Sequence, residues 1–203
     1  MKLRFFPLSL SLAFLAAPGA SAQAPTGYAS VAMQSGFHFV TNPFYGVSNK
    51  VARFIPLAAE GMELYKFSDG KFSTNTFTSG AWTNPDETLG PGEGAVIFNP
   101  TTKRITATFT GELPQGSLRN TIPAGLSLKS SLVPQSGRIS TDLGLNLSPF
   151  DNVYQWRTNR YEVFTFLPDG TWIPSEPMVS VAQALFIRAN LEVAWVRTFK
   201  INQ

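Results

Sequence analysis

The feature that most constrains this fold is an internal duplication. Residues from Gly36 onward align with residues from Gly125 onward at an offset of 89, which becomes 90 before Gly170. Identical pairs keep one order along the chain: Gly36/Gly125, Tyr65/Tyr154, Thr76/Thr165, Phe77/Phe166, Gly80/Gly170, Trp82/Trp172, Ile97/Ile187, Thr108/Thr198 and Phe109/Phe199. Self-similarity at a fixed spacing predicts two copies of one structural unit.

Each copy has the residue pattern of β-strands. Phe37 and Phe39 alternate with more polar or smaller residues, which predicts a strand with both rings on one face. The turn at 68–70 (Ser-Asp-Gly) separates two such segments and predicts a hairpin. Beyond the first residues no segment sustains the helical period, although a short helix or turn is expected within 47–60.

The expected fold is therefore all-β, with two homologous halves of about 75 residues forming a pseudo-twofold barrel- or sandwich-like unit. Barrel and sandwich both stay open. The predicted segments are a signal peptide (1–22), an N-terminal lead (23–35), β repeat 1 (36–111), a connector (112–124) and β repeat 2 (125–203). The connector is too short and too uncharged for a free linker, and its residues 118–122 could form a strand.

The first 22 residues have the three parts of a signal peptide. Lys2 and Arg4 precede an apolar run at 5–17, and the small residues Ala20 and Ala22 follow it. We expect cleavage after Ala22 and a secreted or periplasmic protein. The run is shorter than the roughly 20 residues of a membrane span. No transmembrane segment is therefore expected after cleavage.

Charge and residue counts exclude several function classes. The formal net charge is +3, and two of the basic residues lie in the predicted leader. Without a clustered basic face, no nucleic-acid partner is expected. The chain has no Cys and one His, which excludes disulfides, thiolate metal sites and Cys nucleophiles. We therefore predict no metal site and no cofactor, and the sequence does not indicate an oligomeric state.

Two features invite a catalytic interpretation that their context does not favour. The run Gly90-Pro91-Gly92-Glu93-Gly94 lacks the Lys-Ser/Thr of a phosphate loop and leads into a predicted strand, so a tight turn is expected. His38 could serve in a catalytic triad, but the chain has no G-x-S-x-G motif. Ser127 takes its place in the second copy, which is typical of a solvent-facing strand position.

Carboxylates in the loops after each paired Trp could support hydrolysis. Glycosidases use two such groups, and Asp86 has an acidic counterpart in Glu176. Glu87 and Glu93 have no acidic counterparts, so surface acids are the simpler interpretation. A calcium site at Asp69, Asp86 or Asp169 lacks the run of acidic ligands that such sites need.

Aromatic residues are the leading candidates for ligand binding. Trp82 and Trp172 lie between a turn and a Pro-containing loop, where a ring can stack on a sugar. Their recurrence in both copies favours a core role instead. Tyr45 and Phe150 have no aromatic counterpart and are further candidates. At 105–110 (ITATFT) the residues Ile105, Ala107 and Phe109 alternate with threonines and are expected to face the core. Trp195 replaces Ile105 at this core-facing position, so packing is expected there.

Several stretches resemble a known kind of module. They are GFHFVTNPF at 36–44, LYKFSDGKF at 64–72 and WIPSEPMVSVAQALFI at 172–187. This order is similar to an uncharacterised duplicated all-β module of secreted or cell-surface proteins of environmental Gram-negative bacteria. The resemblance implies compartment and repeat architecture and supplies no catalytic residues.

Two functional hypotheses follow. The first is a secreted, non-enzymatic module for binding, adhesion or envelope structure, with a glycan or a cell-envelope component as partner. The alternative is a secreted polysaccharide hydrolase that uses loop carboxylates such as Asp86 or Glu176. Two carboxylates converging in a cleft beside an exposed aromatic residue would favour the hydrolase.

Overall fold

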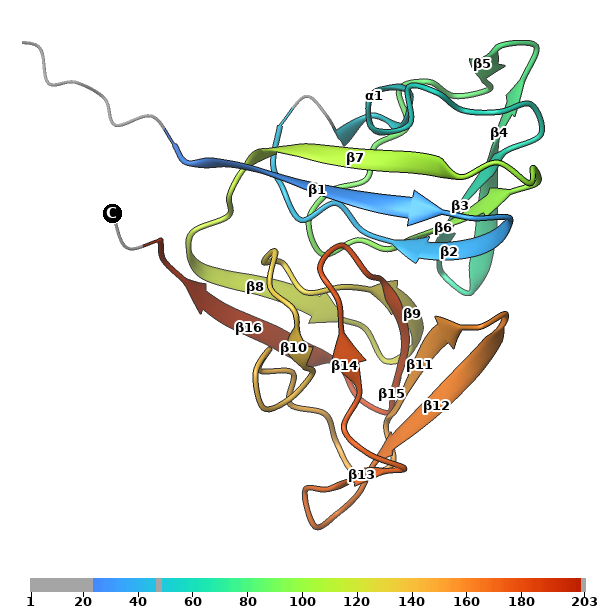
Figure 1. The fold of residues 1–203 in the computed structure, drawn as a ribbon. Coiled ribbons are helices and arrows are strands. Elements are labelled where there is room, and N and C mark those ends of the chain that lie inside the picture. The colour runs from blue at the N-terminus through green and yellow to red at the C-terminus, as the bar shows by residue number, and fades with distance from the viewer. Residues whose placement is uncertain (1–23, 47–48, 202–203) are drawn as a thin grey trace, which may run out of the picture.

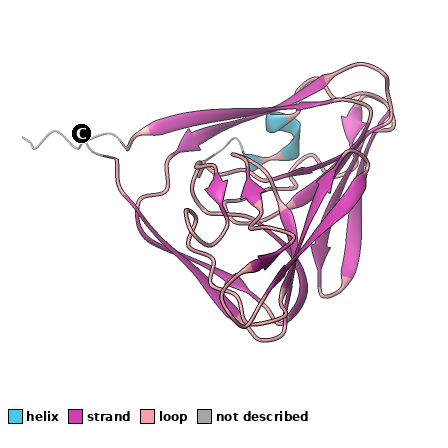
Figure 2. Cartoon of the chain, turned by 60° about the horizontal axis from the view of Figure 1, so that its bottom comes forward, coloured by secondary structure: helices cyan, strands magenta, loops and turns pink. Residues whose placement is uncertain are grey.

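The computed structural model describes residues 24–46 and 49–201. The predicted signal peptide and its cleavage point after Ala22 lie outside the described residues. The described chain consists of strands and one short helix, α1 (Val51–Phe54), so the all-β prediction is confirmed (Figures 1 and 2). The helix lies within 47–60, where the sequence predicts a helix or turn. No helix of the described chain has the length and apolarity needed to cross a membrane.

The first half, which we define as residues 24–112, contains one five-stranded antiparallel sheet and one two-stranded ribbon. The sheet has the order β2-β6-β3-β4-β5, with β2 (Gly36–Val40), β3 (Glu63–Ser68), β4 (Lys71–Thr78), β5 (Ala81–Trp82) and β6 (Ala95–Asn99). The ribbon pairs β1 (Thr26–Met33) with β7 (Ile105–Glu112). Ile105, Ala107 and Phe109 of β7 are buried in the core of this half, as the alternation predicts.

The second half, residues 113–201, has the same kinds of parts. Its sheet has the order β13-β12-β11-β15-β9, with β9 (Gly125–Lys129), β11 (Asn152–Arg157), β12 (Arg160–Phe166), β13 (Trp172–Ile173) and β15 (Leu185–Ala189). A ribbon pairs β8 (Gly116–Ile122) with β16 (Val193–Phe199), and β10 (Gly137–Arg138) pairs with β14 (Met178–Val179). Trp195 of β16 is buried, and its indole N–H donates to the Leu143 carbonyl at 2.7 Å, which confirms its predicted core position.

Two strands lie in segments that the sequence places outside the repeats. Strand β1 falls within the predicted lead at 23–35, and β8 falls within the predicted connector at 112–124. Each pairs with the last strand of its own half. Such a pairing joins residues far apart in the sequence, so local spacing does not show it.

Both five-stranded sheets place a tight hairpin next to the other half. In β3–β4 the two turn residues are Asp69 and Gly70, which have φ of 51° and 74°. In β11–β12 they are Thr158 and Asn159, with φ of 46° and 61°. Two positive φ values in a two-residue loop suit the right-handed twist of the flanking strands. The hairpin predicted at 68–70 is therefore confirmed.

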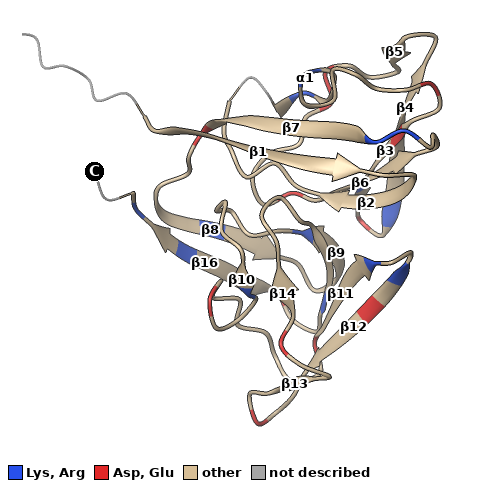
Figure 3. Ribbon diagram, in the orientation of Figure 1, with Lys and Arg blue, Asp and Glu red and all other residues tan. Residues whose placement is uncertain are grey.

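Besides the core of each half, a third apolar cluster lies where the halves meet. No sheet of the described residues is closed into a barrel. This third cluster comes from the faces of the two large sheets that point toward each other. Its members are Val96, Leu128, Ala184, Phe186, Phe39, Tyr65, Phe67 and Tyr154. Acidic and basic residues are spread over both halves (Figure 3).

Candidate ligand-binding cleft

The faces of the two large sheets that point toward each other form a cleft lined by aromatic rings. Strand alternation places Tyr65 and Phe67 of β3 in it, and Leu64, directly before Tyr65, points into the core of the first half. On the other side β11 places Tyr154 and Trp156 in the cleft in the same way. We call this region the aromatic cleft.

The aromatic cleft contains two neighbouring cavities. The first, which we call the Phe37 cavity, has a volume of about 390 Å³ and is lined by Phe37, Phe39, Tyr65, Phe72, Val96, Trp156 and Tyr161. The second, the Arg188 cavity, has a volume of about 500 Å³ and is lined by Phe67, Phe72, Leu126, Tyr154, Tyr161, Phe186 and Arg188. Both volumes lie in the range of small-molecule sites, roughly 300–1,000 Å³. Phe72 and Tyr161 line both cavities, so the two spaces are contiguous.

Rings from both halves hold the cleft together. Phe39 lies 5.9 Å from Trp156 and 5.7 Å from Phe186, measured between ring centroids. Phe67 lies 5.2 Å from Phe186 in an edge-to-face arrangement. These separations are those of favourable aromatic pairs, worth about 0.5–1.5 kcal/mol each beyond burial. The rings at the centre of the cleft therefore line it and also hold the two halves together.

The side chains toward the opening of the cleft remain exposed. The exposed fractions are 40% for Phe37, 54% for Phe72, 43% for Leu126 and 46% for Tyr161. All four line one or both cavities. A contiguous exposed apolar patch of this kind marks an interaction site more often than a scattered exposed residue does.

Most residues of the two cavities correspond to each other at the repeat offset, although Leu128, the counterpart of Phe39, lines neither cavity. Tyr65 of the Phe37 cavity matches Tyr154 of the Arg188 cavity, and Phe72 matches Tyr161. The pairs Phe37/Leu126, Val96/Phe186 and Phe67/Trp156 follow the same rule. One pair differs in chemistry, because Arg188 lines its cavity where the other half has Phe98.

Arg188 is the one charged residue among those that line the two cavities. It is exposed on β15, opposite Leu126 of β9 and Asn152 of β11. No ion pair within the described residues involves its guanidinium. Phe98 instead packs on Phe37 at 4.8 Å. The aromatic cleft is therefore apolar at one end and cationic at the other.

The two cleft tyrosines of the first cavity have perturbed hydroxyls. Burial, together with donation of its hydrogen bond to Glu63, raises the pKa of Tyr65 to about 12. Burial also raises the pKa of Tyr161. Both phenols are consequently neutral at physiological pH, and the hydroxyl of Tyr65 is already engaged.

None of the four aromatic residues singled out in the sequence lines the cleft. Trp82 is 5% exposed and Trp172 is 8% exposed, and each packs on a phenylalanine in the core of its own half. Their indole N–H groups have no partner among the described residues. Tyr45 and Phe150 are exposed on loops outside the two cavities. Cleft-lining rings such as Phe72 and Tyr161 do recur as pairs in the repeat, but recurrence also marks core positions.

The predicted carboxylates do not form a pair. Asp86 is exposed in the first half and lies 2.7 Å from Lys50. Glu176, in the second half, accepts hydrogen bonds from the backbone of Ser140 and Thr141 and from the Thr141 hydroxyl. It therefore organises a loop. Glu176 does line a further cavity of about 600 Å³ together with Glu162, which is 3.8 Å from Arg157, and Tyr161 of the aromatic cleft also lines it.

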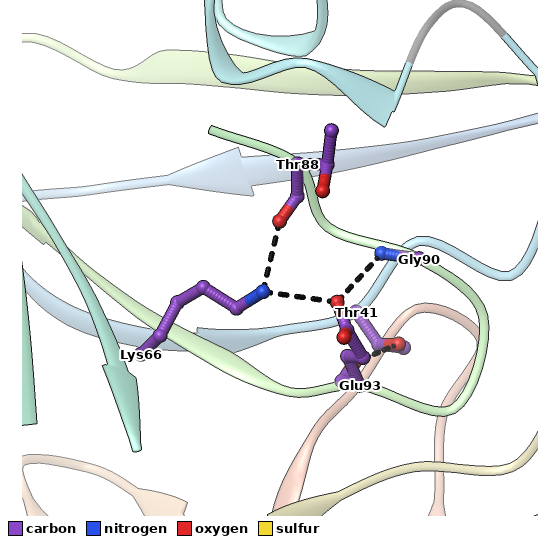
Figure 4. Close-up of polar contacts among 5 residues, drawn as sticks. All are labelled: Thr41, Lys66, Thr88, Gly90 and Glu93. Carbon is purple, nitrogen blue, oxygen red and sulfur yellow. Dashed lines mark hydrogen bonds and ion pairs between the residues drawn. The ribbon is translucent and has the colours of Figure 1, made fainter. Parts of the chain in front are cut away.

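The glycine-rich run is a turn, as predicted, with a polar network around Glu93 (Figure 4). The Glu93 carboxylate accepts hydrogen bonds from Lys66 and from the backbone N–H of Gly90, both at 3.0 Å. Lys66 also donates to the Thr88 carbonyl, and the Thr41 hydroxyl donates to the Glu93 carbonyl. These contacts hold the loop in place.

The remaining polar candidates have structural partners or no ligand geometry. The Nε2 atom of His38 lies 2.8 Å from the Gln34 carbonyl, close to it in the chain. The described residues contain no group of three or more His, Asp or Glu side chains that could hold a metal ion. Asp169 binds Thr171 within its own turn, which lowers the pKa of its carboxyl.

No protein-family model matches the chain, and neither a curated protein nor a solved structure shows detectable similarity to it.

Proposed function

We propose that this chain is an exported, non-catalytic binding module and that its aromatic cleft binds an apolar ligand. One observation carries the proposal: four large apolar side chains stay about half exposed around two contiguous cavities. Full burial of a large apolar side chain contributes about 1.5–3 kcal/mol, and covering one of these half-exposed groups contributes roughly half of that. A ligand that covers them gains that free energy.

The chemistry of the cleft favours an apolar component of the cell envelope over a glycan. A glycan site combines a ring with several polar groups that bind sugar hydroxyls. Around the Phe37 cavity the side chains are aromatic or aliphatic, and the Tyr65 hydroxyl is occupied by Glu63. An apolar chain or ring needs no hydrogen-bonding partner there.

Binding of the neutral apolar dye N-phenylnaphthylamine tests this proposal. We expect saturable binding to the purified protein with a rise in dye fluorescence, and a change in Trp156 emission because this indole lines the Phe37 cavity. The variant Phe72→Ser removes an exposed ring shared by both cavities and should weaken binding severalfold.

Tyr28→Ser is the matched control, since it removes a ring that is 78% exposed on β1, outside both cavities. It should leave the affinity unchanged. Failure of the wild-type protein to bind the dye, or equal loss in both variants, would contradict an apolar site in the cleft. Circular dichroism of each variant checks that the fold persists.

The proposed export depends on the sequence of the leader. Expression of the full chain in a Gram-negative host should yield a periplasmic or secreted protein whose first residue is Gln23. Edman sequencing of the exported form measures this. Retention of an intact leader in the cytoplasm would contradict the proposal.

We also propose that the two halves arose by duplication and are related by a pseudo-twofold axis. The matching strand orders of the two large sheets support this. So do the cavity residues that correspond at the repeat offset. A structure of the crystallised protein in which the halves do not superpose would overturn the proposal.

A polysaccharide hydrolase is the second proposal, favoured only by the cavity that Glu162 and Glu176 line together. Turnover of a polysaccharide panel that is abolished by Glu162→Gln would support it. Absence of turnover across the panel would leave the binding module as the sole proposal.

A further inference from the structure

The aromatic cleft has one polar feature that a purely apolar ligand would not use. Arg188 lines the second cavity among aromatic and aliphatic side chains, and no described acid pairs with it. The guanidinium presents fixed N–H donors that match a carboxylate in two parallel hydrogen bonds. An anionic ligand gains most from such a group, because it pairs with the charge as well as accepting the hydrogen bonds.

Charges of both signs lie near the cleft, and the Glu63 carboxylate accepts a hydrogen bond from the Tyr65 hydroxyl beside the Phe37 cavity. Lys71 and Arg160 begin β4 and β12, directly before the shared residues Phe72 and Tyr161. No ion pair within the described residues involves either of them. Figure 3 shows basic residues at both ends of the turn between β11 and β12. One of these, Arg157, lies 3.8 Å from Glu162, and Asp69 is the acid in the opposing hairpin turn.

We infer that the ligand is an amphipathic anion, a long-chain carboxylate, whose chain lies in the Phe37 cavity and whose head group pairs with Arg188. This inference rests on the proposed function, because it assumes that the aromatic cleft binds an apolar body. Phe72 and Tyr161 line both cavities, so the proposed molecule would extend from one cavity past these rings into the other. The replacement of Phe98 by Arg188 in the second half gives the ligand a single orientation.

Calorimetric titration with dodecanoate and with dodecanol separates the two levels of the proposal. Both probes have the same chain, and only dodecanoate carries a charge. We expect dodecanoate to bind at least about tenfold more tightly, since a hydrogen bond to a charged group commonly has an effect of that size. Arg188→Met should remove this difference between the two probes.

Arg119→Met is the matched control, because Arg119 is also an exposed strand arginine but lies on β8, outside the two cavities. It should preserve the preference for dodecanoate. Equal affinity of the wild-type protein for both probes, or a preference that survives in Arg188→Met, would overturn the carboxylate assignment while the binding proposal stands. Binding of neither probe, together with failure of the dye, would overturn both.

A second copy of this chain is the competing occupant of the cleft. Sedimentation velocity of the wild-type protein and of Phe72→Ser distinguishes it. A ligand site predicts the same oligomeric state for both. A dimer that dissociates in the Phe72→Ser variant and excludes dodecanoate would assign the cleft to self-association and overturn the inference.

Discussion

Loops 90–94 and 180–184 make the same backbone contacts with different side chains. In the first half the Gly92 carbonyl accepts from Ser130, and Gly94 donates to Leu128. In the second the Ala182 carbonyl accepts from Thr41, and Ala184 donates to Phe39. Each loop therefore binds the edge strand of the other half, β9 or β2, with two bonds of 3.0–3.3 Å.

Side chains around the two loops also take equivalent positions with different charge. Lys66 donates to the Thr88 carbonyl and pairs with Glu93. In the second half the buried Gln155 donates to the Met178 carbonyl, and Gln183 accepts from the Ser180 backbone. Two neutral amides thus take the positions of the ion pair, without a hydrogen bond between them among the described residues. The comparison indicates that the interface between the two halves depends on backbone geometry and close packing more than on charge.

The largest expected change in unfolding free energy is at Gly92, the positive-φ position of loop 90–94. Gly92 has φ of 81°, and a Cβ there would lie 2.6 Å from the Asn120 side-chain nitrogen and 2.8 Å from Leu132. Gly92→Ala should lower the free energy of unfolding by about 2–4 kcal/mol, from backbone strain and overpacking together. Urea denaturation measures it.

Ala182 is the counterpart of Gly92 and already has φ of 60°. Ala182→Gly relieves that strain but loosens the unfolded chain, so its effect should stay below about 1 kcal/mol. Equal changes in unfolding free energy for Gly92→Ala and Ala182→Gly would contradict the close packing around Gly92.

The next effect concerns the point where the loops meet. A Cβ on Gly94 would lie 2.6 Å from Leu128 and 2.9 Å from the Cβ of Ala184, so the two loops have room for one methyl group there. Gly94→Ala should cost about 1–3 kcal/mol of unfolding free energy. Adding Ala184→Gly should restore part of it, which a double-mutant cycle measures. Strict additivity would contradict direct contact between the loops.

A pH effect distinguishes the paired tyrosines of the cleft. Because the folded pKa of Tyr65 is raised from 10.0 to about 12, the folded state retains this proton more strongly than the unfolded state. The contribution of Tyr65 to stability is therefore fully present below about pH 10 and is lost between about pH 10 and 12. Tyr65→Phe should flatten this decline in urea midpoints measured across that range.

Tyr154→Phe is the matched variant, since no hydrogen bond within the described residues engages the Tyr154 hydroxyl. It should leave the decline above pH 10 in place. A decline that persists in Tyr65→Phe and disappears in Tyr154→Phe would reverse the assignment.

The smallest effect is that of the ion pair. The side chains of Lys66 and Glu93 are 26% and 49% exposed, which limits the contribution of the pair to less than about 1 kcal/mol. The double variant Lys66→Gln/Glu93→Gln copies the amides of the second half and should unfold within that margin of the wild type. A much larger loss would show that charge does support the interface between the two halves.

Local patterns in the sequence predicted a large part of the fold. Alternation predicted the burial of Ile105, Ala107 and Phe109, and the repeat predicted the packing of Trp195. The Asp69-Gly70 turn predicted a hairpin because few residues adopt positive φ without cost. The pairings of β1 with β7 and of β8 with β16 could not be predicted in the same way, because they join segments distant in sequence.

The candidate site was harder to predict for a different reason. Strands such as β3 carry large apolar residues on both faces, with Leu64 buried in one core and Tyr65 facing the cleft. Period-two alternation then shows that neighbouring side chains point to opposite faces of the strand. It does not show which face the rest of the protein buries. The isolated aromatics Tyr45 and Phe150 therefore stood out in the sequence, although neither lines a cavity of the cleft.

The sequence by itself determined the all-β class, the turns at 68–70 and 90–94, and the burial of individual residues such as Ile105 and Trp195, because those depend on the spacing of residues along the chain. Only the tertiary structure decided that the two large sheets face each other across an aromatic cleft, and that Arg188 lies in it opposite an apolar end. The packing of one half against the other sets which rings are covered and which remain exposed, and no local pattern encodes that packing.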